Sequence, residues 1–181
     1  MAVIISVALF AITVAINPRS LNMAALGSIL LLTLVLSFAS AGQTMVLIGG
    51  GLDFTVGAVM SSAAILTTYV MNGQDGRFLL VFALAIGMGI GVGLLNGICS
   101  VKIDLPPMIV TMAISNVVTR MQYVLTQGNP GGYAGPKFVG SVIDKIWGFI
   151  PSLTLYALLL VPLVFFLLNK SRFGKQLYMM G

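Results

Sequence analysis

A run of glycines followed by an aspartate is the segment of this sequence best suited to chemistry. It reads GGGLDFTVG over residues 49–57 and separates two long apolar stretches. Glycine adopts the left-handed backbone that ends many helices, and an aspartate accepts the free amides at the start of the next one. A helix break in a membrane also leaves backbone groups that are tolerated only where they are buried or face water, and ionisable side chains there are costly and usually functional. We therefore expect Asp53 to cap a helix and to face a path for polar solutes.

Amide side chains within apolar stretches are further candidates for contact with a polar solute. Asn96 follows alternating glycines from Gly87 to Gly93, and glycines four residues apart let a neighbouring helix approach closely. Asn96 is expected either to hydrogen-bond across helices or to meet a solute, and both expectations stay open. Gln43 lies in the apolar stretch before the glycine run.

The stretch 106–126 is unusually polar for a helix that faces lipid, so we expect it in the interior of the protein. Its polar residues are Thr111, Ser115, Asn116, Thr119, Arg120, Gln122 and Thr126. An arginine is expensive at the bilayer centre. Arg120 is therefore expected to reach an interface, to pair with an acidic residue or to face water.

The composition places most of this chain in lipid. Of its 181 residues, 59% are hydrophobic and 7% charged, whereas soluble domains carry about 25% charged residues. The mean hydropathy is +1.09. The net charge is +5, but the basic residues are scattered singly, so no nucleic-acid partner is expected. Membrane lipid is therefore the expected partner of the protein's outer surface.

Several classes of enzyme are excluded by the residues that are missing or misplaced. The sequence has no histidine, which removes histidine-based triads and most catalytic zinc sites, and the lone Cys99 forms no metal-binding pattern. An intramembrane aspartyl protease needs a second aspartate in lipid, but Asp75, Asp104 and Asp144 all fall in predicted turns or loops. The only Gly-Lys pair, at 174–175, lacks the phosphate-binding pattern. We expect no enzymatic activity, no bound metal and no cofactor, and any driving ATP must bind another subunit.

The predicted fold is an all-α polytopic transmembrane helical bundle, one permease-like domain over residues 1–181. About six spans are expected, at residues 1–16, 22–48, 54–71, 78–100, 106–126 and 151–168. Pro107 suits the first turn of its helix. Residues 127–150 form the predicted extracytoplasmic loop, in which Val142–Phe149 could be an interfacial helix anchored by Trp147. The cluster Lys170–Lys175 favours a cytoplasmic tail, which with six spans also puts the N-terminus inside.

Three segments resemble the permease subunits of bacterial ATP-binding-cassette sugar importers of the ribose type. Gly50–Met60, GGLDFTVGAVM, is similar to that family's Gly-Gly-Ile-Asp-Leu-Ser-Val-Gly-Ser-Val. Gly93–Thr126 resembles its Gly-Leu-x-Asn-Gly and Lys-x-x-Ile-Pro-x-Phe-Ile-x-Thr-Leu motifs, although Thr119-Arg120 stands where the family has Arg-Gly. Ser171–Gly181, SRFGKQLYMMG, resembles the start of its cytoplasmic Thr-Arg-Phe-Gly-Arg segment. Family members have about ten spans, so the chain looks like an N-terminal fragment or a truncated product.

The resemblance implies a bacterial inner-membrane permease that moves a monosaccharide-like solute inward. Its expected partners are an ABC ATPase subunit that binds ATP, a periplasmic or lipoprotein solute-binding protein, and a second permease copy in a homodimer or heterodimer. The resemblance also implies that the tail approaches the ATPase, at Arg172, Phe173 and Gly174. Our candidates for the solute path are Gln43, Asp53, Asn96 and Asn116.

Two other functional hypotheses remain at this point. The chain could be a membrane remnant that transports nothing, because the second half of the family's sequence is missing. It could instead be a channel or secondary transporter without an ATPase, although the intramembrane carboxylates of proton-coupled carriers are scarce here.

Overall fold

The computed structural model describes residues 1–18, 22–146 and 150–180, and nearly all of them are helical. The elements are α1 (Ala2–Ile16), α2 (Met23–Ile48), α3 (Val56–Met71), the 3-10 helix η2 (Asp75–Arg77), α4 (Phe78–Lys102), α5 (Pro107–Thr126), α6 (Pro136–Ile143), β1 (Lys145–Ile146), β2 (Ile150–Pro151), α7 (Leu153–Asn169) and α8 (Arg172–Met180). The two short strands pair antiparallel. The predicted all-α class is confirmed, and Pro107 does open its helix.

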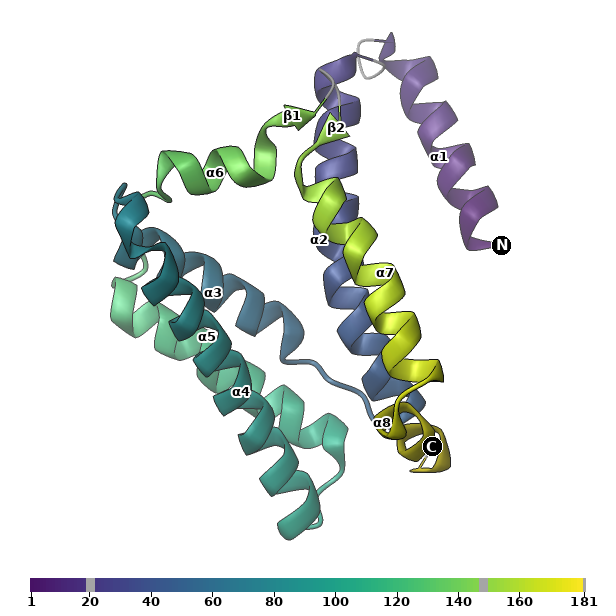
Figure 1. Ribbon diagram of the computed structural model, residues 1–181, viewed down its shortest axis with the longest axis vertical. Coiled ribbons are helices and arrows are strands. Elements are labelled where there is room, and N and C mark those ends of the chain that lie inside the picture. Colours follow the sequence, from purple (N-terminus) through teal and green to yellow (C-terminus); the bar gives the residue numbers. More distant parts are fainter. Residues whose placement is uncertain (19–21, 147–149, 181) are drawn as a thin grey trace.

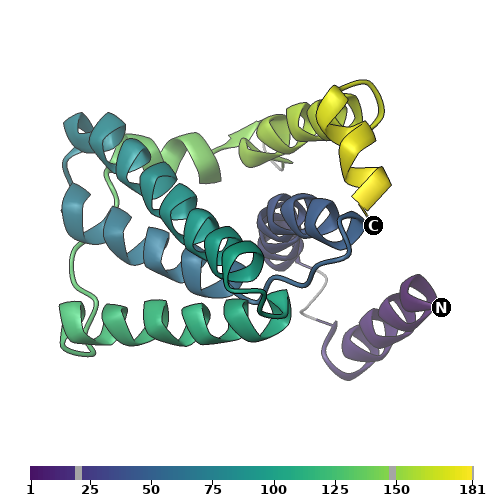
Figure 2. The same ribbon diagram turned by 90° about the horizontal axis from the view of Figure 1, so that it is seen from below.

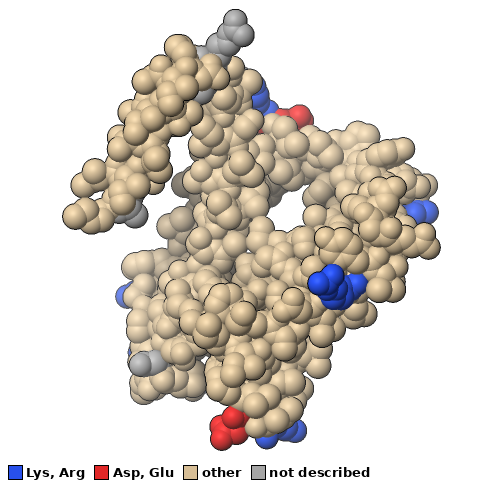
Figure 3. All heavy atoms as spheres, turned by 180° about the vertical axis from the view of Figure 1, so that it is seen from behind, with Lys and Arg blue, Asp and Glu red and all other residues tan. Residues whose placement is uncertain are grey.

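Among the residues that the structure describes, three helical segments are long and apolar enough to cross a membrane: Met23–Ile48, Asp75–Lys102 and Pro107–Thr126. The pair α7 and α8, bent by 66°, makes a fourth if it counts as one span, and two more apolar helices are shorter, Ile4–Ile16 and Val56–Met71. Large apolar side chains cover the outside of these helices, as Leu79, 76% exposed, illustrates. The face in Figure 3 carries few charged residues. Such a surface suits lipid, and the chain is a multi-pass membrane protein.

The helices form two groups (Figures 1 and 2). Helices α3, α4 and α5 pack on one another, while α2 packs on α7 and α8. The groups are joined at one end by the chain segment between α2 and α3, and at the other end α6 runs from η2 toward α7 (Figure 1). Helix α1 stands apart from both groups in the same view.

The alternating glycines of α4 do not receive a neighbouring helix as we expected. A Cβ atom built on Gly87, Gly89, Gly91 or Gly93 would meet no atom within 4 Å among the described residues. Helix α4 instead buries Val81 and Val92. Its contacts with α3 and α5 therefore use ordinary aliphatic side chains rather than close backbone approach.

Helix α6 corrects the predicted structure of residues 127–150. The expected helix at Val142–Phe149 is wrong, because the helix ends at Ile143 and the strand β1 follows; Trp147, like Arg19, lies outside the described residues. The helix begins earlier because Pro136 suits a first turn and Asp75 caps it from another part of the chain. The Asp75 Oδ1 atom accepts from the backbone N–H groups of Lys137 at 2.9 Å and Phe138 at 3.3 Å.

The Asp75 cap predicts a local effect of mutation. Replacing Asp75 with Ala should cost about 1 kcal/mol at the α6 N-terminus, or roughly fivefold in its opening equilibrium, because two amides lose their acceptor. Hydrogen exchange of the protein in lipid nanodiscs should therefore quicken at the amides of Lys137 and Phe138. Lys137→Ala is the matched control, since that exposed side chain can be removed without touching the backbone N–H. Unchanged exchange in Asp75→Ala would show that the carboxylate does not hold α6.

Candidate functional site

The glycine run does end α2, as predicted. Gly49 donates its N–H to the Met45 carbonyl at 3.2 Å, Gly50 has a φ of 75°, and Gly51 donates to the Val46 carbonyl at 3.0 Å. The backbone is then irregular from Gly51 to Thr55, and α3 begins at Val56. This irregular segment between two apolar helices is called the break below.

Asp53 has a different role from the predicted helix cap. The cap position of α3 is held by Thr55, and the Asp53 Oδ1 atom accepts from the Thr55 backbone N–H at 2.7 Å and from its hydroxyl at 2.6 Å. A carboxylate that bonds the backbone two residues ahead forms a turn of its own, which places Asp53 before the helix rather than on it. Asp53 is half-buried, and Thr55 is only 2% exposed.

Asn96 of α4 extends this hydrogen-bonded chain. Its Nδ2 donates to the Thr55 hydroxyl oxygen at 3.1 Å. Thr55 gives its single hydroxyl proton to Asp53, so its oxygen must accept from Asn96, and this fixes which end of the amide faces Thr55. The Asn96 Oδ1 atom is buried and has no hydrogen-bond partner in the part of the chain that the structure describes. Of the two expectations for Asn96, the bond across helices is thus present, and one acceptor atom remains unused.

Helix α5 also reaches the break, through a residue that the sequence did not single out as a path candidate. The Thr111 hydroxyl lies 3.2 Å from the Leu52 carbonyl and 3.3 Å from the Met108 carbonyl, and the residue is 4% exposed. Its bond to Leu52 satisfies a backbone group of the break. Asp53, Thr55, Asn96 and Thr111 therefore form one polar cluster, which draws on the break, α4 and α5.

A second polar cluster lies between α3 and α5. Gln122 Nε2, which has two hydrogens to donate, lies within hydrogen-bonding reach of the Ala58 carbonyl at 3.0 Å, the Ser61 hydroxyl at 3.1 Å and the Ser62 hydroxyl. Ser62 and Gln122 border a cavity of about 580 Å³ whose other walls, from α3, α4 and α5, are mostly aliphatic. The sequence had only marked Gln122 as one of the polar residues of its stretch.

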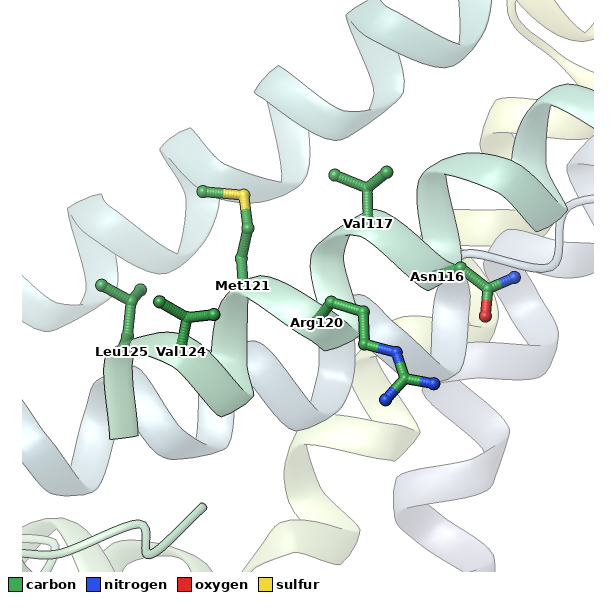
Figure 4. A pocket seen from close by; sticks show the side chains of 6 residues that line it. All are labelled: Asn116, Val117, Arg120, Met121, Val124 and Leu125. Carbon is green, nitrogen blue, oxygen red and sulfur yellow. The ribbon is translucent and has the colours of Figure 1, made fainter. Parts of the chain in front are cut away.

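Asn116 and Arg120 lie on a different face of α5. Both are exposed, and Asn116 Nδ2 bonds only the Met112 carbonyl of its own helix, at 2.9 Å. They border a hollow of about 440 Å³ on the α5 surface, and Figure 4 shows them pointing away from Val117 and Met121. The expectation that this whole stretch is interior is therefore wrong for Asn116 and Arg120. No carboxylate of the described residues pairs with Arg120.

Gln43 is separate from the break as well. It is half-buried in α2, a helix that packs on α7, and its Oε1 atom is buried without a hydrogen-bond partner among the described residues. Of the four path candidates, the structure brings together Asp53 and Asn96, and it leaves Gln43 and Asn116 elsewhere.

The three residues expected to approach an ATPase begin α8. Arg172 and Phe173 are exposed, whereas Gly174 is buried where the chain bends from α7 into α8. A Cβ atom on Gly174 would collide with the carbonyl oxygens of Leu167 and Leu168, and its N–H bonds the Ser171 hydroxyl at 3.1 Å. Gly174 is thus required for the bend, while Arg172 and Phe173 are free to contact another protein.

The polar cluster predicts that the Thr55 hydroxyl holds α4 against the break. Thr55→Val keeps the shape of the side chain but leaves Asn96 Nδ2 unpaired, so it should destabilise the packing of α4 by about 1 kcal/mol. Cys99, the single cysteine, lies half-buried on α4, so the temperature at which a thiol-reactive dye labels it in detergent reports the loosening of this helix. Thr55→Ser retains the hydroxyl and should label like the wild type. Equal labelling temperatures for Thr55→Val and wild type would contradict the assignment.

Comparisons with known proteins match this sequence to membrane permeases. The sequence profile of the family described as branched-chain amino acid transport system / permease component matches residues 25–181. The probable ABC transporter permease protein y4mJ of Sinorhizobium fredii is 30% identical over 149 residues, 78% of this chain and 42% of that protein. The ribose import permease protein RbsC of Bacillus subtilis is 27% identical over 170 residues, 92% of this chain and 52% of that protein.

A third relative is the autoinducer 2 import system permease protein LsrC of Yersinia enterocolitica, 28% identical over 182 residues, 99% of this chain and 49% of that protein. The chain spans about half the length of the curated relatives it matches. No solved structure matches the chain. The chain belongs to the permease family described as branched-chain amino acid transport system / permease component, and within it resembles the ABC permeases of sugar import systems.

Proposed function

We propose that this chain supplies part of the solute path in an ATP-driven importer of a monosaccharide-like solute. The polar cluster at the break carries the proposal, because it gathers a carboxylate, two hydroxyls and an amide between apolar helices. Broken helices in transporters place their irregular backbone where it lines a cavity. A sugar hydroxyl both donates and accepts, so it can bond the unused Asn96 Oδ1 and the Asp53 carboxylate. Asp53 and Asn96 are therefore favoured over Gln43 and Asn116 as path residues.

The partners of the importer are part of the same proposal. ATP binds a separate ATPase subunit, which is supported by the lack of a phosphate-binding loop in these 181 residues. A periplasmic or lipoprotein binding protein delivers the solute, and a second permease copy completes the membrane part. Relatives are named as import permeases for ribose and autoinducer 2, and another is named as an inner-membrane protein. We accordingly place this chain in the bacterial inner membrane.

The orientation in the membrane is also a proposal. Helix α8 and the turn after Lys102 lie at the end of the molecule opposite α6 (Figure 1). Basic residues near membrane-crossing helices favour the cytoplasmic side, and the group Lys170–Lys175 lies at the α8 end. This places residues 127–150 outside, and it offers Arg172 and Phe173 to the ATPase.

Transport by the complete importer tests the role of Asn96. In vesicles that hold the permease, the ATPase and the binding protein, Asn96→Ala should lower ATP-driven uptake of labelled ribose about tenfold, since a buried hydrogen bond to the solute is lost. Asn116→Ala, an asparagine outside the cluster, should retain uptake. A normal rate for Asn96→Ala would remove this residue from the path. Uptake that continues without the ATPase would overturn the importer itself and favour a channel or secondary transporter.

A further inference from the structure

The C-terminal helix α8 packs on Gly49, which caps the end of α2 two residues before the break. Leu177, 8% exposed, is the apolar side chain that α8 buries, and its Cδ1 atom lies 3.1 Å from the place where a Cβ atom of Gly49 would be. Gly49 is the residue that ends α2. The absence of a side chain at Gly49 therefore creates the space that Leu177 fills.

Gly49, which Leu177 contacts, lies only a few residues before Asp53 and Thr55 of the polar cluster. Gly51, two residues on, is bonded to the Val46 carbonyl, Leu52 is bonded to Thr111, and Asp53 to Thr55. Each of these bonds fixes one step of the backbone from the α2 end to the start of α3. A shift of Gly49 would therefore be passed along a short segment held by three hydrogen bonds rather than absorbed by a flexible loop.

The bend between α7 and α8 is also fixed, which gives α8 a definite direction. Gly174 packs directly on the carbonyls of Leu167 and Leu168, and the Ser171 hydroxyl bonds both the Leu167 carbonyl and the Gly174 N–H. Closely packed backbones of this kind move as a unit. A force applied to the exposed side chains of α8 would thus tilt the whole helix and reach Leu177.

We propose that Leu177 is a positioning residue, and that its contact with Gly49 sets the conformation of the break and so of the Asp53–Thr55–Asn96 hydrogen bonds. The relevance of this link to transport rests on the proposed function, but the link itself is a property of this chain. In the importer, a partner protein that contacts α8 would alter the polar cluster through Leu177, although the partner itself does not contact the cluster.

Hydrogen exchange of the 181-residue chain in lipid nanodiscs tests the link. Leu177→Ala leaves a cavity at Gly49, and the Gly51 and Thr55 amides should then exchange about tenfold faster. Tyr178→Ala changes the neighbouring side chain, which is 56% exposed, and should leave these rates within about twofold of wild type. The α5 amides report whether the α3–α5 group stays folded. Unchanged exchange at Gly51 and Thr55 in a folded Leu177→Ala variant would overturn the proposal.

A second variant covers the case in which Leu177→Ala loosens the whole chain. Gly49→Ala adds a methyl group against Leu177 Cδ1, so it should perturb the same amides from the other side of the contact while keeping the α8 side chain. Fast exchange at Thr55 in Gly49→Ala supports the link, and wild-type rates contradict it. Because neither measurement uses transport, uptake that continues without the ATPase would refute the proposed function and leave this result standing.

Discussion

The lack of water in a bilayer requires every backbone polar group of this chain to find a partner within the protein. Helices meet that requirement by themselves, but the break between α2 and α3 does not. Three of its backbone groups find partners within the protein: the Gly51 N–H bonds the Val46 carbonyl, the Leu52 carbonyl accepts from Thr111, and the Thr55 N–H bonds the Asp53 carboxylate. Helices α4 and α5 pack beside the break, where α5 bonds the Leu52 carbonyl through Thr111 and α4 bonds the Thr55 hydroxyl through Asn96. The arrangement of the α3–α5 group therefore follows from one irregular segment of five residues.

The same segment explains why some polar residues of this protein form hydrogen bonds between elements and others do not. Thr55 and Thr111 are almost fully buried and form bonds between elements, whereas Asn116 and Arg120 make none with another element in the described part of the chain. A polar side chain in lipid gains most where it replaces a missing backbone partner. The break provides such places, whereas between the continuous helices α3 and α5 Gln122 lies within reach of a helix carbonyl and two hydroxyl groups.

Much of the fold could be read from the apolar runs and the residues that interrupt them, since helix ends in a membrane are marked by glycine, proline and polar turns. The sides of α5 could also have been separated from sequence. Ser115 and Gln122 lie within about 40° of Thr111 around a helix, and Arg120 lies about 180° from Thr111. Treating the stretch as uniformly interior missed this pattern.

Helix α6 could not be predicted from neighbouring residues alone, because its cap, Asp75, is 62 residues before Lys137. Thr55 rather than Asp53 holds the cap position of α3, because the Asp53 carboxylate bonds the Thr55 N–H and hydroxyl. Which donors the carboxylate reaches depends on the backbone geometry of the break.

The cap of α6 has a bearing on how the protein is made. Asp75 and Phe78 leave the ribosome before Lys137 and Phe138, and the ring centroids of the two phenylalanines end 5.8 Å apart. A binding place for α6 can therefore exist before α6 is synthesised. Helix α2 is in the opposite position, since α7 and α8, on which it packs, come much later in the chain. During synthesis, the α3–α5 group can assemble while α2 waits in lipid for its neighbours, so the break also separates a part of the chain that packs early from a helix that packs late.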